Sequence, residues 1–344
     1  MGSEWLLGEN VFRSLQRNEY ILVAKHQLQA DFCDGKIGPF KYKRKDGRIA
    51  VVGIFGKNVE PTAPSGFRID YLIWSLRIYA LLIKRINRSK IRHINFAQVL
   101  TPIPKLVRSS PNFQFGPVGG QGPWYKVRFL PIKNRLTNFV IFKGIYGLLR
   151  SQIKQMNVVF AHPLLAERFE SSNVSPAIKL PREQMAQVSK RRQVVHVSRR
   201  VYFKLPELHH RLFQALAARH PEVDFMIIGK GWGNITIQKN LHFKENLPRS
   251  EIMRIFAESQ FHINLSLELA GIVNLEAALN RCITIGSKNS GATYLLDPNE
   301  KFLIDLYDPD ISEARIFKQV SDAIAAFDEV EAERQFNNAS YHTF

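Results

Sequence analysis

Residues 261–287 read FHINLSLELAGIVNLEAALNRCITIGS and have the pattern of a strand, a helix and a second strand. The apolar runs 261–267 and 282–287 are continuous rather than alternating, which is typical of strands covered on both faces of a parallel sheet. Between them, Gly271 precedes a stretch of helical character over 272–280. This segment predicts one βαβ unit, in which a helix crosses over between two parallel strands.

The same alternation of short apolar runs and helical stretches extends along the whole chain of 344 residues. Further strands are expected at 20–26, 48–56, 91–97, 113–118, 157–163, 193–198, 223–231, 241–246 and 301–306, and further helices at 206–219, 249–258 and 311–327. Repeated βαβ units predict two Rossmann-like, doubly wound α/β domains with parallel sheets.

Charge is distributed unevenly between the two halves. The formal net charge is +18, and residues 1–170 hold 27 Lys and Arg against 10 Asp and Glu, whereas the rest of the chain is nearly balanced. A polar stretch without helix or strand periodicity begins at residue 170. We therefore expect a basic N-terminal domain at 1–170, a linker at 171–192 and a C-terminal domain at 193–344. The basic domain predicts an anionic partner.

Composition excludes several classes of protein. Cys33 and Cys282 are the only cysteines, so neither a disulfide framework nor a cysteine-rich metal site is expected. The first twelve residues lack the basic start and long apolar core of a signal peptide. No apolar run reaches the length of about 18 residues that a membrane-spanning helix needs. We expect a cytoplasmic protein.

Candidate site residues follow the strands at their carboxyl ends, where open α/β sheets bind ligands. Glu268 follows the strand at 261–267, and Glu276 lies one to two turns into the next helix. Free amides at Gly271, Ile272 and Val273 would favour a phosphate. Two glutamates at this spacing are also common on a solvated helix face.

Basic side chains follow another strand, at 193–198. Arg199 and Lys204 gather there, with Arg200 as a neighbour, and the glycine-rich turn 227–233 follows a third strand. Fixed cations and amides suit a leaving diphosphate, because its charge grows as the bond breaks. A plain β-turn would explain the glycines equally well.

Together these residues resemble the donor-binding domain of retaining glycosyltransferases of the GT-B fold, family 4, also called glycosyl transferases group 1. Glu268 and Glu276, separated by seven residues with Gly271 between them, match that family's two-glutamate motif. Arg199 and Lys204 keep its Arg-to-Lys spacing. The resemblance implies two Rossmann-like domains facing a cleft.

The resemblance also implies roles for these residues. Glu268 would be a catalytic residue that hydrogen-bonds the donor sugar, and Glu276 would bind the nucleotide ribose. Arg199 and Lys204, with the amides at 271–273, would bind the diphosphate. Neither a metal nor another cofactor is implied.

In the first half, the turn FGPVGGQGP at 115–123 resembles a GPVGG segment in the subset of that family that builds bacterial surface polysaccharides. The strand at 91–97 and the GSE at 2–4 resemble further segments of the subset. This resemblance implies that His93 is a catalytic candidate and that Gly119, Gly120 and Ser3 belong to an acceptor or cleft loop. The alternatives are a structural histidine at position 93 and a plain loop at the glycines. The subset also has a strand before the GSE and a final helix after the last residues, so the first sheet is expected to lack its first strand.

Basic residues in the first half are mixed with aromatic and aliphatic ones. Residues 121–160 contain seven Lys and Arg and no acid, and 67–93 contain one acid. Such surfaces bind anionic lipid leaflets. A core-facing helix with a solvated basic face is the alternative.

The resemblance, together with the basic surfaces, thus implies a retaining hexosyltransferase at the inner face of the bacterial plasma membrane. It would move a sugar from a nucleotide-sugar to a lipid-linked or growing polysaccharide acceptor of an O-antigen, capsule or exopolysaccharide. No nucleic-acid partner is expected. Three alternatives are a glycosidase using the two glutamates, an inactive glycosyltransferase-like partner, and a nucleic-acid-binding protein with Trp124, Tyr125 and Phe129 as stacking groups.

Overall fold

The computed structural model divides the chain into two compact units, each built around its own sheet. One comprises Met1–Gln121 with Ile141–Ile178, and the other Gly122–Val140 with Lys179–Phe344. The structure describes residues 19–25, 35–37, 40–45, 48–54, 76, 79–80, 83, 90–94, 103–118, 122–160, 162–174, 188–232, 238–268, 271–290, 293–297 and 300–341, the first four ranges by backbone alone. The predicted α/β class with parallel sheets is confirmed.

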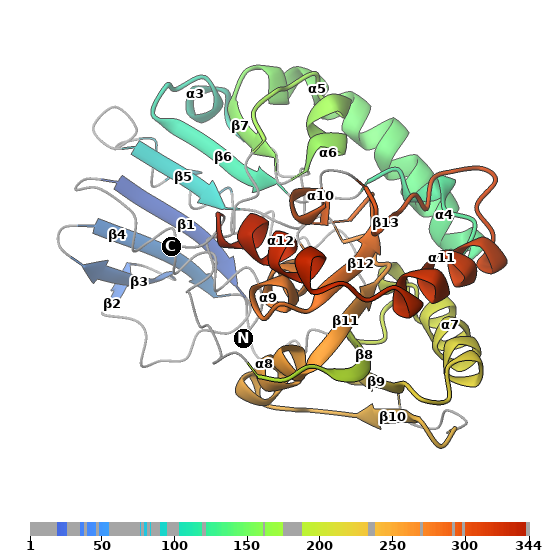
Figure 1. Ribbon diagram of the computed structural model, residues 1–344. Helices are drawn as coiled ribbons and strands as arrows, with labels where there is room; N and C mark the ends of the chain where they lie inside the picture. The colour runs from blue at the N-terminus through green and yellow to red at the C-terminus, as the bar shows by residue number, and fades with distance from the viewer. Residues whose placement is uncertain are drawn as a thin grey trace. The chain divides into compact units, whose positions relative to one another are not determined.

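The first unit has a seven-stranded sheet in the order β2-β3-β4-β1-β5-β6-β7 (Figure 1). β3 pairs antiparallel with its neighbours, and all other pairs are parallel. Sequence reasoning missed the short hairpin of β2 and β3. The strands are β1 (Glu19–Lys25), β2 (Gly35–Ile37), β3 (Phe40–Lys45), β4 (Arg48–Ile54), β5 (Lys90–Ile94), β6 (Phe113–Val118) and β7 (Asn157–Phe160). The expectation that this sheet lacks its first strand concerns the start of the chain, and residues 1–18 lie outside the described ranges.

Helices of the first unit include α3 (Lys105–Arg108), α5 (Tyr146–Lys154) and α6 (Pro163–Arg168). The expected strand at 157–163 ends earlier, at Phe160. The reason is local: the His162 ring accepts a hydrogen bond from the Leu164 amide at 3.2 Å and caps α6, and Pro163 suits the first helical position.

The second unit has a six-stranded sheet in the order β10-β9-β8-β11-β12-β13, and every pair is parallel. The strands are β8 (Arg191–Val197), β9 (Asp224–Ile228), β10 (Leu241–Lys244), β11 (Ser259–Asn264), β12 (Ile283–Ser287) and β13 (Leu303–Ile304). The first of these strands lies in the middle, and the chain reverses direction across the sheet between β8 and β11. Ligands of doubly wound sheets bind at such a switch point, beyond the carboxyl ends of the strands.

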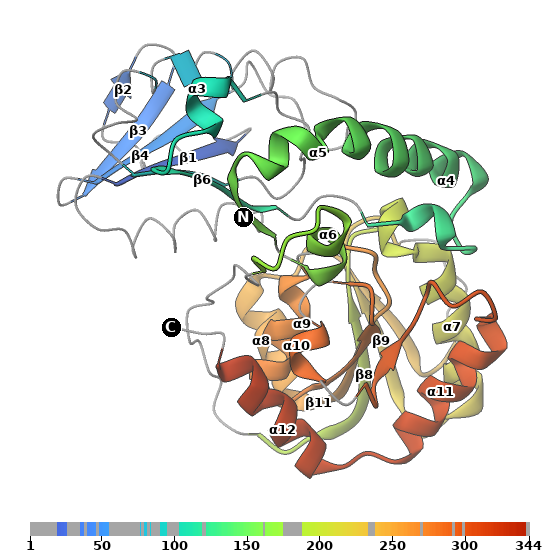
Figure 2. The same cartoon turned by 90° about the horizontal axis from the view of Figure 1, so that it is seen from above.

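Helices cover both faces of this sheet (Figure 2). α7 (Pro206–Arg219) and α11 (Glu313–Ala325) lie on one face, and α8 (Arg249–Glu258), α9 (Ile272–Leu279) and α12 (Glu329–Ser340) lie on the other, with the short α10 (Thr293–Leu296). The larger apolar core forms under α7 and α11, where Phe213 and Val320 are fully buried. Within the described ranges, no helix combines the length and apolar character needed to cross a membrane.

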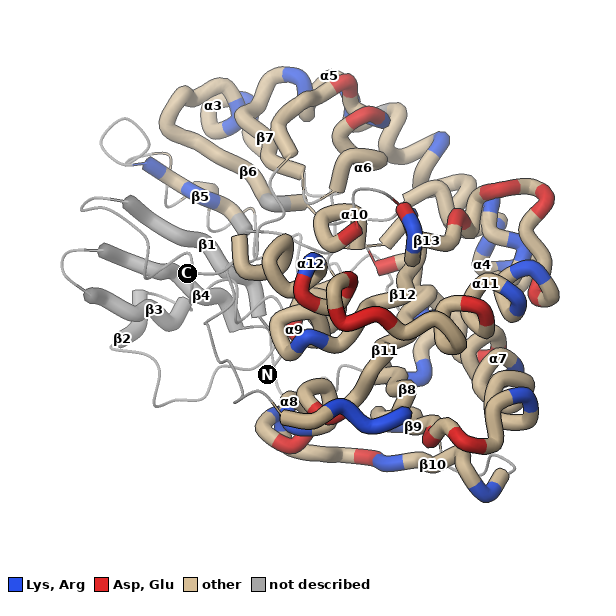
Figure 3. The backbone as a smooth tube through the Cα atoms, viewed as in Figure 1, with Lys and Arg blue, Asp and Glu red and all other residues tan. Residues whose placement is uncertain are grey.

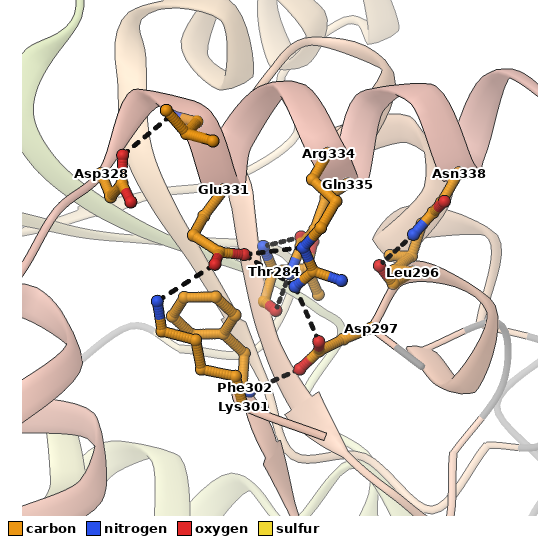
Figure 4. Close-up of polar contacts among 11 residues, drawn as sticks. Thr284, Leu296, Asp297, Lys301, Phe302, Asp328, Glu331, Arg334, Gln335 and Asn338 are labelled. Atoms are coloured by element: carbon orange, nitrogen blue, oxygen red, sulfur yellow. Dashed lines mark hydrogen bonds and ion pairs between the residues drawn. The ribbon is translucent and has the colours of Figure 1, made fainter. Parts of the chain in front are cut away.

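Helix α12 was not predicted, and polar contacts hold it in place (Figure 4). The Gln335 amide bonds both backbone groups of Thr284 in β12, accepting from the amide at 2.8 Å and donating to the carbonyl at 3.3 Å. Arg334 pairs at 2.8 Å with Asp297, whose side chain is fully buried. Asp328 caps the helix by accepting from the Val330 amide.

Residues 122–140 pack with the second unit, in contrast to the division expected at residue 170. Trp124 is 5% exposed and stacks on Phe203 with 5.9 Å between ring centroids. Val127 and Leu130 join the same apolar core. Burial of the large apolar surface of a tryptophan stabilises the fold, and Trp124 is buried in the core of the second unit.

Candidate functional site

Lys204 and Glu268 lie at the switch point of the second sheet. Lys204 ends a 3-10 turn after β8, and Glu268 follows β11. The Lys204 ammonium forms an ion pair with the Glu268 carboxylate. The lysine side chain is 10% exposed and the glutamate side chain 32%. Two residues 64 positions apart, both predicted from the sequence, thus meet at one place.

Backbone contacts hold the two loops together beside this pair. The Leu267 amide donates to the Phe203 carbonyl at 2.9 Å. The buried His209 ring bridges the same loops, because its Nε2 accepts from the Leu265 amide at 2.9 Å. Its Nδ1 must then carry the proton, and it donates to the Leu205 carbonyl at 3.0 Å. Burial lowers the pKa of His209 to about 4, which keeps this neutral tautomer.

Two more buried histidines lie close to His209. The His196 ring stacks on it with 3.9 Å between centroids and donates from Nδ1 to the Ile263 carbonyl at 2.7 Å. Burial lowers the pKa of His262 to about 3, with smaller contributions from His209 and Lys204. Neither ring nitrogen of His262 has a partner among the described residues. Sequence reasoning missed all three, although each lies within or beside an apolar run.

Buried polar groups surround the start of α9. The Asn264 side-chain amide donates to the Asn274 side-chain oxygen at 2.7 Å. The remaining polar atoms, Asn264 Oδ1, Ser266 Oγ and Asn274 Nδ2, are buried without a partner among the described residues. Gly271 is the N-cap of α9, and no side chain caps this helix. Amides at a helix start lack intrahelical acceptors, so this region offers donors and acceptors to a polar ligand.

Glu276 lies in the second turn of α9 and is paired with Arg249 of α8. The carboxylate oxygen and the guanidinium nitrogen are 3.0 Å apart, and the Glu276 side chain is 16% exposed. The sequence did not predict this partner. Ile272 and Val273 occupy the first turn of α9 and are half-buried.

Arg199 is exposed at the end of β8, and its neighbour Arg200 pairs with Glu207 at 2.7 Å.

Close packing explains the glycine in the turn after β9. Gly229 has a φ of +143°, and a Cβ there would lie 2.0 Å from the Ser198 carbonyl oxygen. Trp232 is buried and donates from its indole to the same carbonyl at 2.7 Å. The turn therefore fixes the end of β8.

The remaining predicted residues belong to the first unit. His93 on β5 is fully buried and shares a hydrogen bond with the Tyr79 hydroxyl. Its ring meets Phe115 edge to face at 4.9 Å, and burial lowers its pKa to about 3. Gly119, Gly120 and Ser3 lie outside the described residues. In the described parts of the chain, no three His, Cys, Asp or Glu side chains are arranged to bind a metal.

Solved structures with two Rossmann-like units are similar to this chain. The E. coli trehalose-6-phosphate protein bound with UDP-2-fluoro glucose superimposes with a TM-score of 0.63 at 12% identity, over 99% of this chain and 93% of that chain. The α,α-trehalose 6-phosphate synthase of Burkholderia multivorans gives 0.60 at 12% identity, over 95% and 94%. An S. aureus TarM mutant in complex with Fondaparinux, α-GlcNAc-glycerol and UDP gives 0.51 at 14% identity, over 77% and 54%. The chain has the GT-B fold.

The family follows from the sequence itself. Residues 161–342 match the model of the glycosyl transferase-like family, and because the match spans more than half of the chain, the chain belongs to that family. A search of the curated proteins finds no relative.

Proposed function

We propose that this protein is a retaining glycosyltransferase that takes a hexose-type sugar from a nucleotide diphosphate donor, with UDP as the first candidate nucleotide. The observation that carries the proposal is the Lys204–Glu268 pair at the switch point of the second sheet. Membership of the glycosyl transferase-like family supports it. Two proteins of similar fold were solved with UDP or a UDP-sugar.

In this proposal the donor diphosphate competes with Glu268 for the Lys204 ammonium. A buried ammonium needs a compensating anion, and the diphosphate would supply it, aided by Arg199 and the amides at the start of α9. Glu268 would then be released to accept hydrogen bonds from the sugar hydroxyls. Glu276 would bind the ribose, while keeping one oxygen on Arg249.

The reaction forms a bond between an acceptor hydroxyl oxygen and the anomeric carbon, while the bond from that carbon to the donor phosphate breaks. The hydroxyl proton passes to the leaving phosphate oxygen, and the anomeric configuration is retained. Lys204, Arg199 and the α9 amides stabilise the charge that develops on the diphosphate. These groups neutralise it without a metal, so we propose no cofactor.

We further propose that the acceptor is lipid-linked or a growing polysaccharide of the bacterial surface, used by a cytoplasmic enzyme at the plasma membrane. The excess of basic residues in 1–170 supports this acceptor. Gly119, Gly120 and Ser3 are the candidates for the acceptor side, whereas His93, fully buried against Phe115, fits its structural alternative.

Two alternatives lose support from side-chain placement. Trp124, a candidate stacking group for nucleic acid, is packed in the core of the second unit. A glycosidase needs carboxylic acids free to exchange protons, whereas both glutamates are paired with cations.

Nucleotide binding tests the proposal. UDP should raise the melting temperature and bind in calorimetry, with GDP and dTDP as competitors. Lys204→Met should weaken UDP binding at least about tenfold by removing a charge-assisted contact, and Glu268→Gln should lower turnover about a hundredfold or more. Lys318→Met, at an exposed position on α11, is the control. If no nucleotide binds, or Lys204→Met binds UDP as the wild type does, the proposal fails.

A further inference from the structure

Helix α4 (Ile132–Phe139) exposes its apolar side. Ile132, Leu136, Phe139 and the following Val140 have exposed fractions of 72%, 62%, 48% and 60%. Their spacing of four, three and one residues places them along one side of a helix. We call these four residues the apolar stripe. Most large apolar side chains among the described residues are buried, so a cluster of exposed ones on one helix needs an explanation.

The opposite side of α4 is polar and faces the protein. Asn138 is 2% exposed. Its side chain donates to the Gly122 carbonyl at 3.1 Å and accepts from the Tyr125 amide at 2.8 Å. Arg135 donates to the Tyr125 carbonyl at 3.0 Å. These bonds fix the rotation of the helix and leave the apolar stripe facing outward.

Positive charge borders the apolar stripe. Lys126 and Lys133 are exposed, and residues 122–140, the part of this segment in the second unit, contain no Asp or Glu. Figure 3 shows the contrast with α12, whose first turns carry several acidic residues. A surface that is apolar in the centre and cationic at its edges complements an anionic lipid leaflet, with acyl chains below and phosphates at the surface.

We propose that α4 lies in the interface of an anionic membrane, with the apolar stripe inserted among the acyl chains and Lys126 and Lys133 on the lipid phosphates. A second copy of the chain fits less well, because it would bring two cationic borders together. The inference adds a docking surface to the proposed transferase, and its test uses no sugar donor, so the two proposals fail independently.

Vesicle cosedimentation tests the docking surface. The wild type should bind vesicles of equal phosphatidylglycerol and phosphatidylcholine, and bind phosphatidylcholine alone far more weakly. The double variant Ile132→Ser with Leu136→Ser should lower the partition coefficient more than about tenfold, because it removes two inserted aliphatic side chains. Its melting temperature should stay unchanged, since neither side chain is packed in the core.

Val330→Ser is the matched control. Val330 is 73% exposed on α12, between acidic neighbours, and its loss should leave vesicle binding as it is. Three results would overturn the inference: no binding of the wild type to the anionic vesicles, binding of the double variant at wild-type strength, or a wild-type dimer in light scattering that the double variant converts to monomer.

Discussion

Lys204 is about nine-tenths buried, and its position explains much of the site. A buried ammonium without an anion carries a desolvation cost of several kcal/mol, so the fold must keep Glu268 within reach. Glu268 itself comes from a loop beyond another strand. The geometry of the pair therefore depends on what joins the two loops, and His209 is the side chain that does so.

His209 should act as a positioning residue. His209→Ala removes two buried hydrogen bonds and should lower the free energy of unfolding by about 2 kcal/mol. Because both loops relax, it should also raise the KM for the donor. His209→Gln can donate to the Leu205 carbonyl and accept from the Leu265 amide, so it should recover part of both losses.

Urea unfolding and steady-state kinetics measure these effects. The neighbouring His210→Ala is the control, since the His210 Nε2 has no partner among the described residues. A His209→Ala variant with reduced stability but an unchanged donor KM would show a structural role only.

At the scale of the element, helix bounds were predictable where local signals are strong. Helices expected at 206–219 and 249–258 match α7 and α8 residue for residue. Pro206 at the first position of α7 and Pro248 before α8 mark their starts. Helix α12 escaped prediction because its fit depends on tertiary partners: its two buried polar contacts reach back to Asp297 and Thr284.

Arg334 should be important for the docking of α12. Arg334→Met leaves the buried Asp297 carboxylate with the Phe302 amide as its remaining partner among the described residues, and this loss should lower the free energy of unfolding by about 3 kcal/mol. Urea unfolding followed by circular dichroism measures it. Lys318→Met breaks an exposed pair with Asp322 and should have little effect. Equal losses in the two variants would contradict the prediction.

Helix α4 shows the limit of pattern reading at this scale. Its sequence has an ordinary amphipathic spacing, which predicts an apolar side facing the core. Only the contacts of Asn138 and Arg135 reveal that the polar side is the one that faces the protein. The prediction of a basic, membrane-facing surface stays a proposal, now assigned to a defined helix.

At the scale of the molecule, the second unit should lose stability in acid because it buries three histidines. Burial lowers the pKa of His209 and His262 to about 4 and about 3, and that of His196 well below its ordinary value. The unfolded chain therefore binds more protons than the folded one below the ordinary value of 6.5. Between that pH and the lowered pKa of each histidine, stability falls by about 1.4 kcal/mol per pH unit for each histidine as the pH decreases, whereas above it the stability is full.

Urea unfolding between pH 7 and pH 5 tests this expectation against the variant His262→Leu. Leucine removes one titrating ring without breaking a hydrogen bond, because neither nitrogen of His262 has a partner among the described residues. The variant should lose less stability over this range than the wild type. The surface variant His242→Leu is the control. An unchanged slope in His262→Leu would refute the assignment.

The sequence by itself determined the α/β class and the positions of most strands, and it predicted Lys204, Glu268, Gly271 and Glu276 as parts of one site. These features are local: continuous apolar runs, prolines at helix starts, and polar residues just after strands. The tertiary structure decided which groups meet. The partner of Glu276, the histidines beside Lys204 and the return of 122–140 to the second unit depend on contacts between residues far apart in the chain, which no local pattern records.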